Sequence, residues 1–365
     1  MKKIIWVLGL LGLGFFLVWM WNKSNFFLDP LSNNSKEIKV KSEFEVFGFL
    51  PTWMVGKTRE YSNQMSHLIF LGIETDEKGN LIWDTQSKKI YSESYLAQKR
   101  IIVENGGKNV LGIKLFDDNK LKTLLGDKEA VANLTRQIKE VVVDENFDGV
   151  NLDFEFQGDP LAILGEEFGV FVDGLRLAGL KDISVDVFAN TIIKGDEQKL
   201  KTLLGKIDNL IVMAYDFHRP GVDFAGSVAP IGSNIGERNI REVLEKIILV
   251  NLDKNKIIMA YPLYGYEWET YTKDFESQIK RGWYQMSSWN RTKELIKEKN
   301  LEVKWDELSM SPWLVFEENG KIHQIYFENE KSLSAKIDLV KQNKLGGWGF
   351  WALGYEGEDE FVWSF

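Results

Sequence analysis

Two carboxyl side chains and an amide alternate along one short segment, and this spacing could support acid–base chemistry. Residues 148–155 read DGVNLDFE. Side chains alternate between the two faces of a β-strand, so Asn151, Asp153 and Glu155 share one face and apolar residues share the other. Two carboxyls this close do not both ionise easily. One pKa is therefore expected to rise, as a general acid near neutral pH requires. A solvated edge strand with its polar face in water is the alternative interpretation.

Two later segments place further polar side chains where predicted strands end. Met213, Tyr215 and Asp216 close one of these strands, in the segment MAYD. Tyr264 follows another, in the segment AYPLYG. A phenol and a carboxylate at neighbouring strand ends would meet the carboxyl pair at one edge of a parallel sheet.

Tryptophan side chains supply a candidate platform for a sugar ring. Trp351 lies in 346–352, GGWGFWA, where glycines allow a large indole to sit close to the backbone. An indole ring against one face of a sugar ring, with an acidic side chain on the opposite side, would suit binding and cleavage of a sugar. Trp53 and Trp268 also follow strand ends, and we expect them to contact further sugars, with burial in a core as the alternative.

Strands and helices alternate along the chain and would position these side chains. Amphipathic stretches such as 128–145 separate eight short apolar or β-branched runs. These runs are 45–50, 67–73, 109–116, 149–154, 183–188, 209–215, 256–261 and 347–352. The alternation predicts an α/β fold, a (β/α)8 TIM barrel, with a doubly wound open sheet as the competitor. No GxGxxG follows the first run, which weakens the dinucleotide-binding version of the open sheet.

One interval is too long for a single crossover helix. Residues 269–343 contain a helix-like stretch at 291–300 and hairpin-like segments at 313–317 and 321–327. We predict a small α+β insertion there, before the last strand, forming one wall of the barrel mouth.

The amino terminus is expected to lie in a membrane. Lys2 and Lys3 precede an uncharged run, 4–21, of nearly the length that crosses a bilayer. We predict a signal-anchor transmembrane helix at 1–22, a polar tether at 23–43 and a catalytic domain at 44–365. The expected location is a single pass through the cell membrane, with the amino terminus cytoplasmic and the catalytic domain outside. Secretion after cleavage, or a buried soluble helix, are the alternatives.

Composition excludes several classes of site and partner. The 365 residues contain no Cys and carry a net charge of −9. Disulfides, thiolate metal sites and iron–sulfur clusters are therefore excluded, and nucleic acid is disfavoured because phosphate binding needs clustered cations. The three histidines lie far apart in the sequence. We expect no metal, no cofactor and a monomeric protein.

Four motifs in order resemble glycoside hydrolase family 18, the chitinases and their relatives. DGVNLDFE is similar to that family's DGxDxDxE signature, and MAYD, YPLYGYEW and GGWGFWALGYE resemble its sixth-, seventh- and eighth-strand motifs. The resemblance covers most of the chain from about 44 to 356. It is nearer to the bacterial spore-lytic, peptidoglycan-active branch than to secreted degraders of crystalline chitin.

The resemblance implies retaining, substrate-assisted hydrolysis of glycans that contain β-linked N-acetylglucosamine (GlcNAc). Glu155 would be the general acid and base, and Asp153 would orient the substrate's own 2-acetamido nucleophile. Tyr215 would hydrogen-bond the acetamido oxygen. The remaining site residues would line the sugar subsites: Asn151, Met213, Asp216, Tyr264, Trp351, Trp53 and Trp268. Peptidoglycan is the first choice of substrate, ahead of chitin-type oligosaccharides and N-glycan cores.

One position departs from the signature. Asn151 stands where the family usually has Asp, and an amide cannot share a proton with its neighbour. We therefore expect Asp153 to ionise more readily than its family counterpart, with activity retained. Inactive members of the family typically replace the acid, which is present here as Glu155. A catalytically inactive carbohydrate-binding protein and a membrane-anchored scaffold are the alternative functions.

Overall fold

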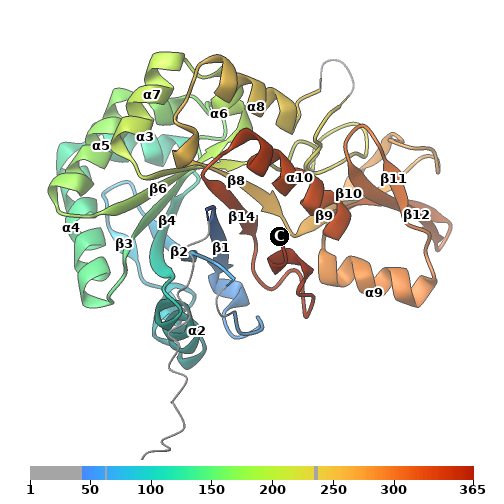
Figure 1. Cartoon of the computed structure of the whole chain (residues 1–365), viewed down its shortest axis with the longest axis horizontal. Coiled ribbons are helices and arrows are strands. Elements are labelled where there is room, and N and C mark those ends of the chain that lie inside the picture. Colours follow the sequence, from blue (N-terminus) through green and yellow to red (C-terminus); the bar gives the residue numbers. More distant parts are fainter. Residues whose placement is uncertain (1–42, 62–63, 234–236) are drawn as a thin grey trace, which may run out of the picture. The chain divides into compact units, whose positions relative to one another are not determined.

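The computed structural model describes residues 43–61, 64–233 and 237–365 (Figure 1). The predicted transmembrane helix, 1–22, lies outside these ranges, as do residues 23–42 of the predicted tether. Within the described ranges, no helix combines the length and apolar character needed to cross a membrane.

A closed barrel of eight parallel strands forms the larger part of the described chain. Its strands, in spatial order, are β1 (Glu45–Pro51), β14 (Gly347–Trp351), β8 (Ile257–Pro262), β7 (Asn209–Met213), β6 (Asp182–Phe188), β5 (Gly149–Phe154), β4 (Lys108–Leu115) and β2 (His67–Thr75). β1 pairs with β14 on one side and β2 on the other, which closes the ring and leaves no open edge. The short strand β3 (Leu81–Ile82) pairs antiparallel with β2. The (β/α)8 prediction is confirmed over the open sheet.

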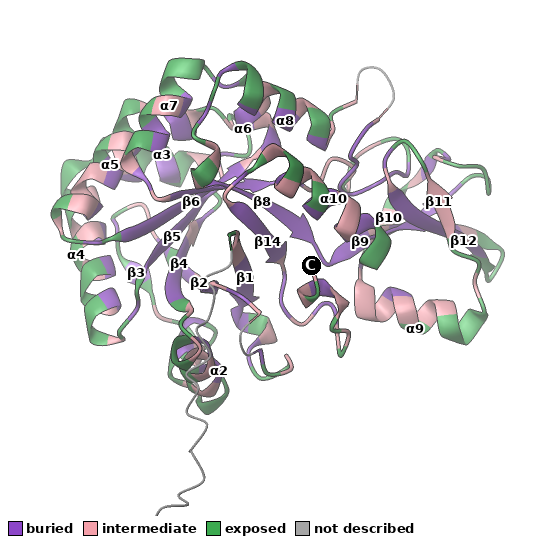
Figure 2. Ribbon diagram, viewed as in Figure 1, coloured by how far each residue is buried: buried purple, intermediate pink, exposed green. Residues whose placement is uncertain are grey.

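Helices cover the outside of the barrel and present their apolar faces to it (Figure 2). They are α2 (Glu93–Glu104), α3 (Asp118–Gly126), α4 (Lys128–Asp144), α5 (Glu166–Leu177), α6 (Ala189–Lys194), α7 (Glu197–Lys206), α8 (Ile240–Leu249) and α10 (Glu330–Asn343). In α4, the side chain of Asp127 accepts from the backbone N–H of Glu129, which caps the helix. Leu134 and Ile138, four residues apart, are buried on its inner face.

A second, five-stranded sheet lies beside the barrel (Figure 1). Its strands, in spatial order, are β10 (Ile279–Ser288), β9 (Tyr264–Thr270), β13 (Lys321–Tyr326), β12 (Ser311–Glu318) and β11 (Lys304–Asp306), and α9 (Trp289–Lys299) packs on one face. The insertion was predicted to start at residue 269, but the second sheet already starts at Tyr264. Only Leu263 separates β8 from β9. Residues 330–343 belong to the barrel instead, since they form α10, where the Lys336 carbonyl accepts from the Tyr261 hydroxyl of β8 at 3.1 Å.

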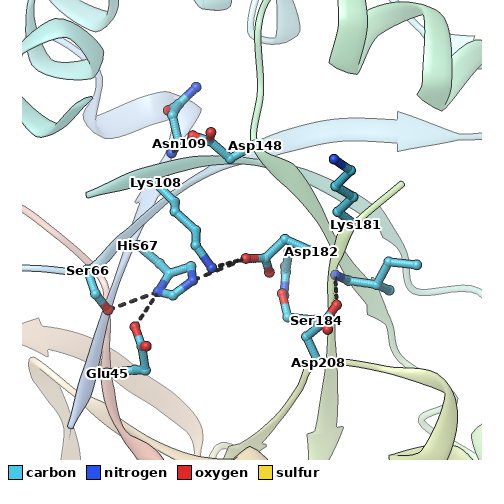
Figure 3. Close-up of polar contacts among 12 residues, drawn as sticks. Glu45, Ser66, His67, Lys108, Asn109, Asp148, Lys181, Asp182, Ser184 and Asp208 are labelled. Atoms are coloured by element: carbon cyan, nitrogen blue, oxygen red, sulfur yellow. Dashed lines mark hydrogen bonds and ion pairs between the residues drawn. The ribbon is translucent and has the colours of Figure 1, made fainter. Parts of the chain in front are cut away.

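Charged side chains fill the amino-terminal end of the barrel interior, which we call the barrel floor (Figure 3). Glu45, His67, Lys108 and Asp182 are the first residues of β1, β2, β4 and β6. His67 is buried between two carboxylates, with Nδ1 at 3.4 Å from Glu45 Oε2 and Nε2 at 3.5 Å from Asp182 Oδ2. Lys108 forms an ion pair with the same Asp182 oxygen. The buried carboxylate of Asp182 thus has a cationic partner in Lys108, as a buried charge requires.

An apolar layer separates this floor from the carboxyl end of the barrel. It consists of inward-facing side chains from β1, β2, β4, β7 and β8: Phe47, Phe49, Ile69, Leu71, Val110, Ile211, Ile258 and Ala260. The barrel interior is therefore a packed core at mid-height, and only its carboxyl end is free to hold a ligand.

Candidate active site

A cavity of about 490 Å³ lies at the carboxyl ends of the barrel strands. It is lined by all but two of the residues predicted for the site: Trp53, Asp153, Glu155, Met213, Tyr215, Asp216, Tyr264 and Trp351. The structure therefore brings together side chains from β5, β7, β9 and β14 and from the turn that follows β1. Asn151 and Trp268 do not line the cavity.

Strand β5 carries the central carboxyls into the barrel interior. Every residue of Gly149–Phe154 is buried, so the edge-strand interpretation is wrong. β5 lies between β4 and β6, and in the register of β4 and β5 the backbone of Asp153 is opposite that of Lys114. Asn151 lies below Asp153 on the same inward face, where its Nδ2 donates to Ser184 Oγ at 3.1 Å and to Asp186 Oδ1 at 2.8 Å.

Four carboxyls at this end of the barrel have raised pKa values, those of Asp153, Asp186, Glu155 and Asp216. Burial raises the pKa of Asp153 well above 3.8, and the charges of Asp186 and Glu155 raise it further, against the opposing effect of Lys114. Burial also raises the pKa of Asp186 to about 8, although the hydrogen bond from Asn151 opposes the rise. The prediction that Asp153 ionises more readily than its family counterpart assumed that no other carboxyl takes the place of position 151. Asp186, on the neighbouring strand, supplies the like charge that position 151 lacks.

Glu155 follows β5 directly and stands at the mouth of the cavity. Its backbone N–H donates to the carbonyl of Leu115 at 3.1 Å, which extends the β4–β5 pairing beyond the strand. Burial raises the pKa of its carboxyl, and the charge of Asp216 adds to this. A hydrogen bond from Gln157 and the charges of Arg219 and Lys114 act in the opposite direction. A glutamic acid whose pKa is raised beside an open cavity is suited to general acid catalysis.

Two tyrosines donate hydrogen bonds to Asp216, and a third, Tyr215, precedes it in the chain. Asp216 Oδ1 accepts from Tyr264 at 2.5 Å and from Tyr266 at 3.2 Å. Its backbone has φ = 60°, a left-handed conformation that a non-glycine residue adopts at a cost. Burial and nearby carboxylates raise the pKa of Tyr215 well above 10, so its phenol stays protonated and can donate a hydrogen bond.

The three tryptophans predicted for the site have different surroundings. Trp351 is half-buried at the end of β14, and Trp53, which is 40% exposed, meets it edge-on with ring centroids 6.1 Å apart. Trp268 is fully buried and packs against Tyr326 in the core of the small sheet. Pairing of β9 with β10 and β13 turns its indole into that core, away from the cavity.

Several residues that line the cavity were not predicted. Asp186 is the clearest, and its signal was present in ISVDVF, where Ser184 and Asp186 alternate with apolar residues as Asn151 and Asp153 do. Lys114, on β4, is similarly placed in NVLGIKLF. Arg219 and Arg238 come from the long connection between β7 and α8, and no periodic pattern marks them. No group of three or more His, Cys, Asp or Glu suited to a metal ion occurs within the described ranges.

Comparison with known proteins agrees with this geometry. The model of glycosyl hydrolases family 18 matches residues 45–356. The uncharacterized glycosylase YvbX of Bacillus subtilis is 26% identical over 334 residues, which cover 87% of this chain and 91% of that protein. A cortical fragment-lytic enzyme of Bacillus subtilis is 24% identical over 308 residues, covering 81% of this chain and 66% of that enzyme.

Solved structures share the fold. The spore cortex-lytic enzyme SleL of Bacillus cereus superposes with a TM-score of 0.70 and 20% identity, over 88% of this chain and 74% of that chain. A chitinase from Cycas revoluta in complex with (GlcNAc)3 has a TM-score of 0.76 and 18% identity, over 88% of this chain and 98% of that chain. Together with the family match, these relatives confirm the resemblance seen in the four sequence motifs.

Proposed function

The chain belongs to glycosyl hydrolases family 18 and is a glycoside hydrolase, and we propose that it cleaves the β-glycosidic bond that follows GlcNAc, with retention of configuration. The supporting observation is the convergence of Glu155, Asp153, Tyr215 and Trp351 on one cavity at the carboxyl end of the barrel. No second carboxylate is needed as nucleophile, because the 2-acetamido group of GlcNAc can take that role.

In the first step, the proton of Glu155 goes to the glycosidic oxygen as the C1–O bond breaks. The acetamido carbonyl oxygen forms a new bond to C1, which closes an oxazolinium ring and places positive charge on the acetamido group. Asp153 accepts a hydrogen bond from the acetamido N–H and stabilises that charge. Tyr215 donates to the acetamido oxygen and holds it below C1. Trp351 supports the apolar face of the sugar.

In the second step, water attacks C1 from the side that the leaving group has vacated. Glu155, now a carboxylate, takes one proton from this water, and the C1–O bond to the acetamido oxygen breaks. The acetamido group is restored, the product retains its configuration, and Glu155 regains the proton with which it began.

Charges around the cavity favour peptidoglycan as the glycan. Lys114, Arg219 and Arg238 all line the cavity. Lys114 pairs with Glu74 at 3.0 Å, and Arg238 pairs with Glu242. Arg219 is exposed and has no side-chain hydrogen bond or ion pair within the part of the chain that the structure describes. Its guanidinium is therefore available to an anionic substrate, such as the lactyl carboxylate of N-acetylmuramic acid next to GlcNAc, whereas chitin oligosaccharides are neutral.

We further propose, from the sequence alone, that the apolar run at 4–21 anchors the chain to the membrane with the catalytic domain outside the cell. This location would hold the enzyme beside the cell wall. Fractionation of cells that express the full chain, with protease added from outside, tests the location. Recovery of the intact chain in the culture medium would contradict it.

Product analysis by mass spectrometry tests the proposed reaction. The full chain is incubated separately with purified peptidoglycan and with chitin oligosaccharides, and Glu155→Gln serves as the matched variant because it keeps the shape of the side chain and removes the acid. We expect fragments with GlcNAc at the reducing end from peptidoglycan, and none with Glu155→Gln. Cleavage of chitin oligosaccharides alone would contradict the choice of substrate but not the chemistry. Binding without cleavage of either glycan would favour an inactive carbohydrate-binding protein.

A further inference from the structure

Asp186 is a buried carboxyl at the active site for which the reaction above provides no role. It lies on β6 and lines the same cavity as Asp153 and Glu155. Only 4% of its surface is exposed. Burial of a carboxyl without a partner is costly, so its surroundings show what holds it there.

The pairing of the strands places Asp186 beside Asp153. In the parallel β5–β6 pair, Asn151 is opposite Ser184 and Leu152 is opposite Val185, and the next residues along the two strands are Asp153 and Asp186. On the other side, Asp186 is paired with the apolar Ile211 of β7. Asp186 is therefore flanked by a carboxyl on one side and by a hydrocarbon side chain on the other.

Hydrogen bonding fixes one oxygen of Asp186. Asn151 Nδ2 donates to Asp186 Oδ1 at 2.8 Å, so a proton on this carboxyl belongs on Oδ2. Asp153 Oδ1 is buried and has no hydrogen-bond partner within the described part of the chain. One carboxyl thus has a fixed amide donor, and its neighbour has an unsatisfied acceptor.

The other charged and titratable groups that line this end of the barrel come from four places: Lys114 on β4, Glu155 after β5, Tyr215, Asp216, Arg219 and Arg238 between β7 and α8, and Tyr264 on β9. The charge of Glu155 raises the pKa of both Asp153 and Asp186, and Lys114 lowers that of Asp153. Lys114 is the cation that lowers the pKa of Asp153, and it is opposed by burial and by the charges of Asp186 and Glu155. Two adjacent buried carboxylates are therefore not both stable near neutral pH.

We propose that Asp186 is a positioning residue that shares one proton with Asp153 and replaces the aspartate that the family signature usually has at position 151. Asn151 holds Asp186 in place, and Asp186 holds the shared proton when Asp153 turns as an anion to the acetamido N–H. The carboxyl pair of the family is preserved, but its second member has moved from β5 to β6. This inference deepens the proposed function and rests on it.

Three substitutions test the pair in the full chain. Asp186→Asn removes the second carboxyl and keeps the shape of the side chain. The double variant Asn151→Asp/Asp186→Asn exchanges donor and acceptor across the same hydrogen bond and returns the carboxyl to position 151. Ser184→Ala is the control, because it removes the other hydrogen bond of Asn151, 3.1 Å long, without removing a carboxyl.

Two measurements are made on each variant. Titration of 13C-labelled aspartate carboxyls by NMR follows the proton without any substrate, and the pH profile of kcat/KM follows its effect on turnover. The parent should show an aspartate step near pH 8, corresponding to the raised pKa of Asp186. We expect Asp186→Asn to lose this step and to lower kcat by about 10- to 100-fold, the effect of losing one hydrogen bond to a charged group. The double variant should regain a shared proton and most of the activity, and Ser184→Ala should retain both.

The proposal is overturned if the parent shows no aspartate that keeps its proton to about pH 8. It is also overturned if Asp186→Asn changes neither the titration nor the pH profile, or if the folded double variant is no more active than Asp186→Asn. Absence of turnover in the parent would count against the proposed function alone, because the NMR titration still decides whether the pair shares a proton. Thermal melting of each variant separates loss of the proton from loss of the fold.

Discussion

Replacing Asp182 by Asn should weaken the barrel in a way that depends on pH. Asp182 lies on the barrel floor, where its Oδ2 accepts from Lys108 and lies 3.5 Å from His67 Nε2 (Figure 3). Burial opposes ionisation of this carboxyl, but hydrogen bonds and charges from His67 and Lys108 outweigh it and lower its pKa from 3.8 to about 2. The folded state therefore favours the charged form of Asp182.

The size of the effect follows from that difference in pKa. One pKa unit corresponds to about 1.4 kcal/mol, so ionised Asp182 contributes about 2 kcal/mol to the free energy of unfolding at neutral pH. The contribution is complete above the pKa of the unfolded chain, near 3.8, and is lost as the pH falls through about 2. The substitution also leaves His67 and Lys108 without their partner, which adds a cost of its own.

Urea unfolding followed by tryptophan fluorescence, at a series of pH values from 7 to about 2, measures this contribution. The gap in unfolding free energy between parent and Asp182→Asn should narrow by about 2 kcal/mol as the pH falls to 2. Asp338→Asn is a matched control, because Asp338 is exposed on α10 and has no ion pair within the described ranges. A gap that stays constant with pH, or the same narrowing in the control, would contradict this role of Asp182.

Three further predictions concern the cavity and the core of the small sheet. Arg219→Gln should raise KM for peptidoglycan by about two- to fivefold, the effect of an exposed ion pair worth up to about 1 kcal/mol; KM for chitin oligosaccharides should stay the same, and an equal rise for both glycans would contradict the role of Arg219. Trp351→Ala should lower kcat/KM at least about threefold through loss of a stacking surface, with little change in melting temperature. Trp268→Ala should instead lower the free energy of unfolding by about 3–5 kcal/mol, as expected for an indole removed from a core, and a folded, fully stable Trp268→Ala with impaired sugar binding would reverse this assignment.

The barrel could be predicted because its signals are local. Runs of β-branched and apolar residues separated by amphipathic helices occur wherever strands covered by helices occur, and all eight runs are barrel strands. The residue at which the insertion begins was harder to predict from the sequence. β8 and β9 are separated by Leu263 alone, so nothing in residues 257–270 marks where the barrel ends and the small sheet begins.

The candidate site, like the fold, could be predicted only in part from the sequence. Alternation along 149–155 is sufficient to place Asn151, Asp153 and Glu155 on one face, because the side-chain period of a strand is a property of the backbone. That alternation does not show which strand lies beside β5. Asp186 became part of the site through the β5–β6 pairing, and Trp268 was removed from it by the pairing of β9 with β10 and β13.

The strand and helix pattern, the inward face of β5 and the family motifs could be identified from the sequence, since each depends on residues close together in the chain. Which charged groups are neighbours in space followed from the packing of the strands. The effect of Asn151 on Asp153 could not be read from position 151 alone, because a carboxyl 35 residues further along the chain lies within hydrogen-bonding distance of Asn151. Electrostatic interactions depend on distance in space and on burial, and both are set by how the strands pack.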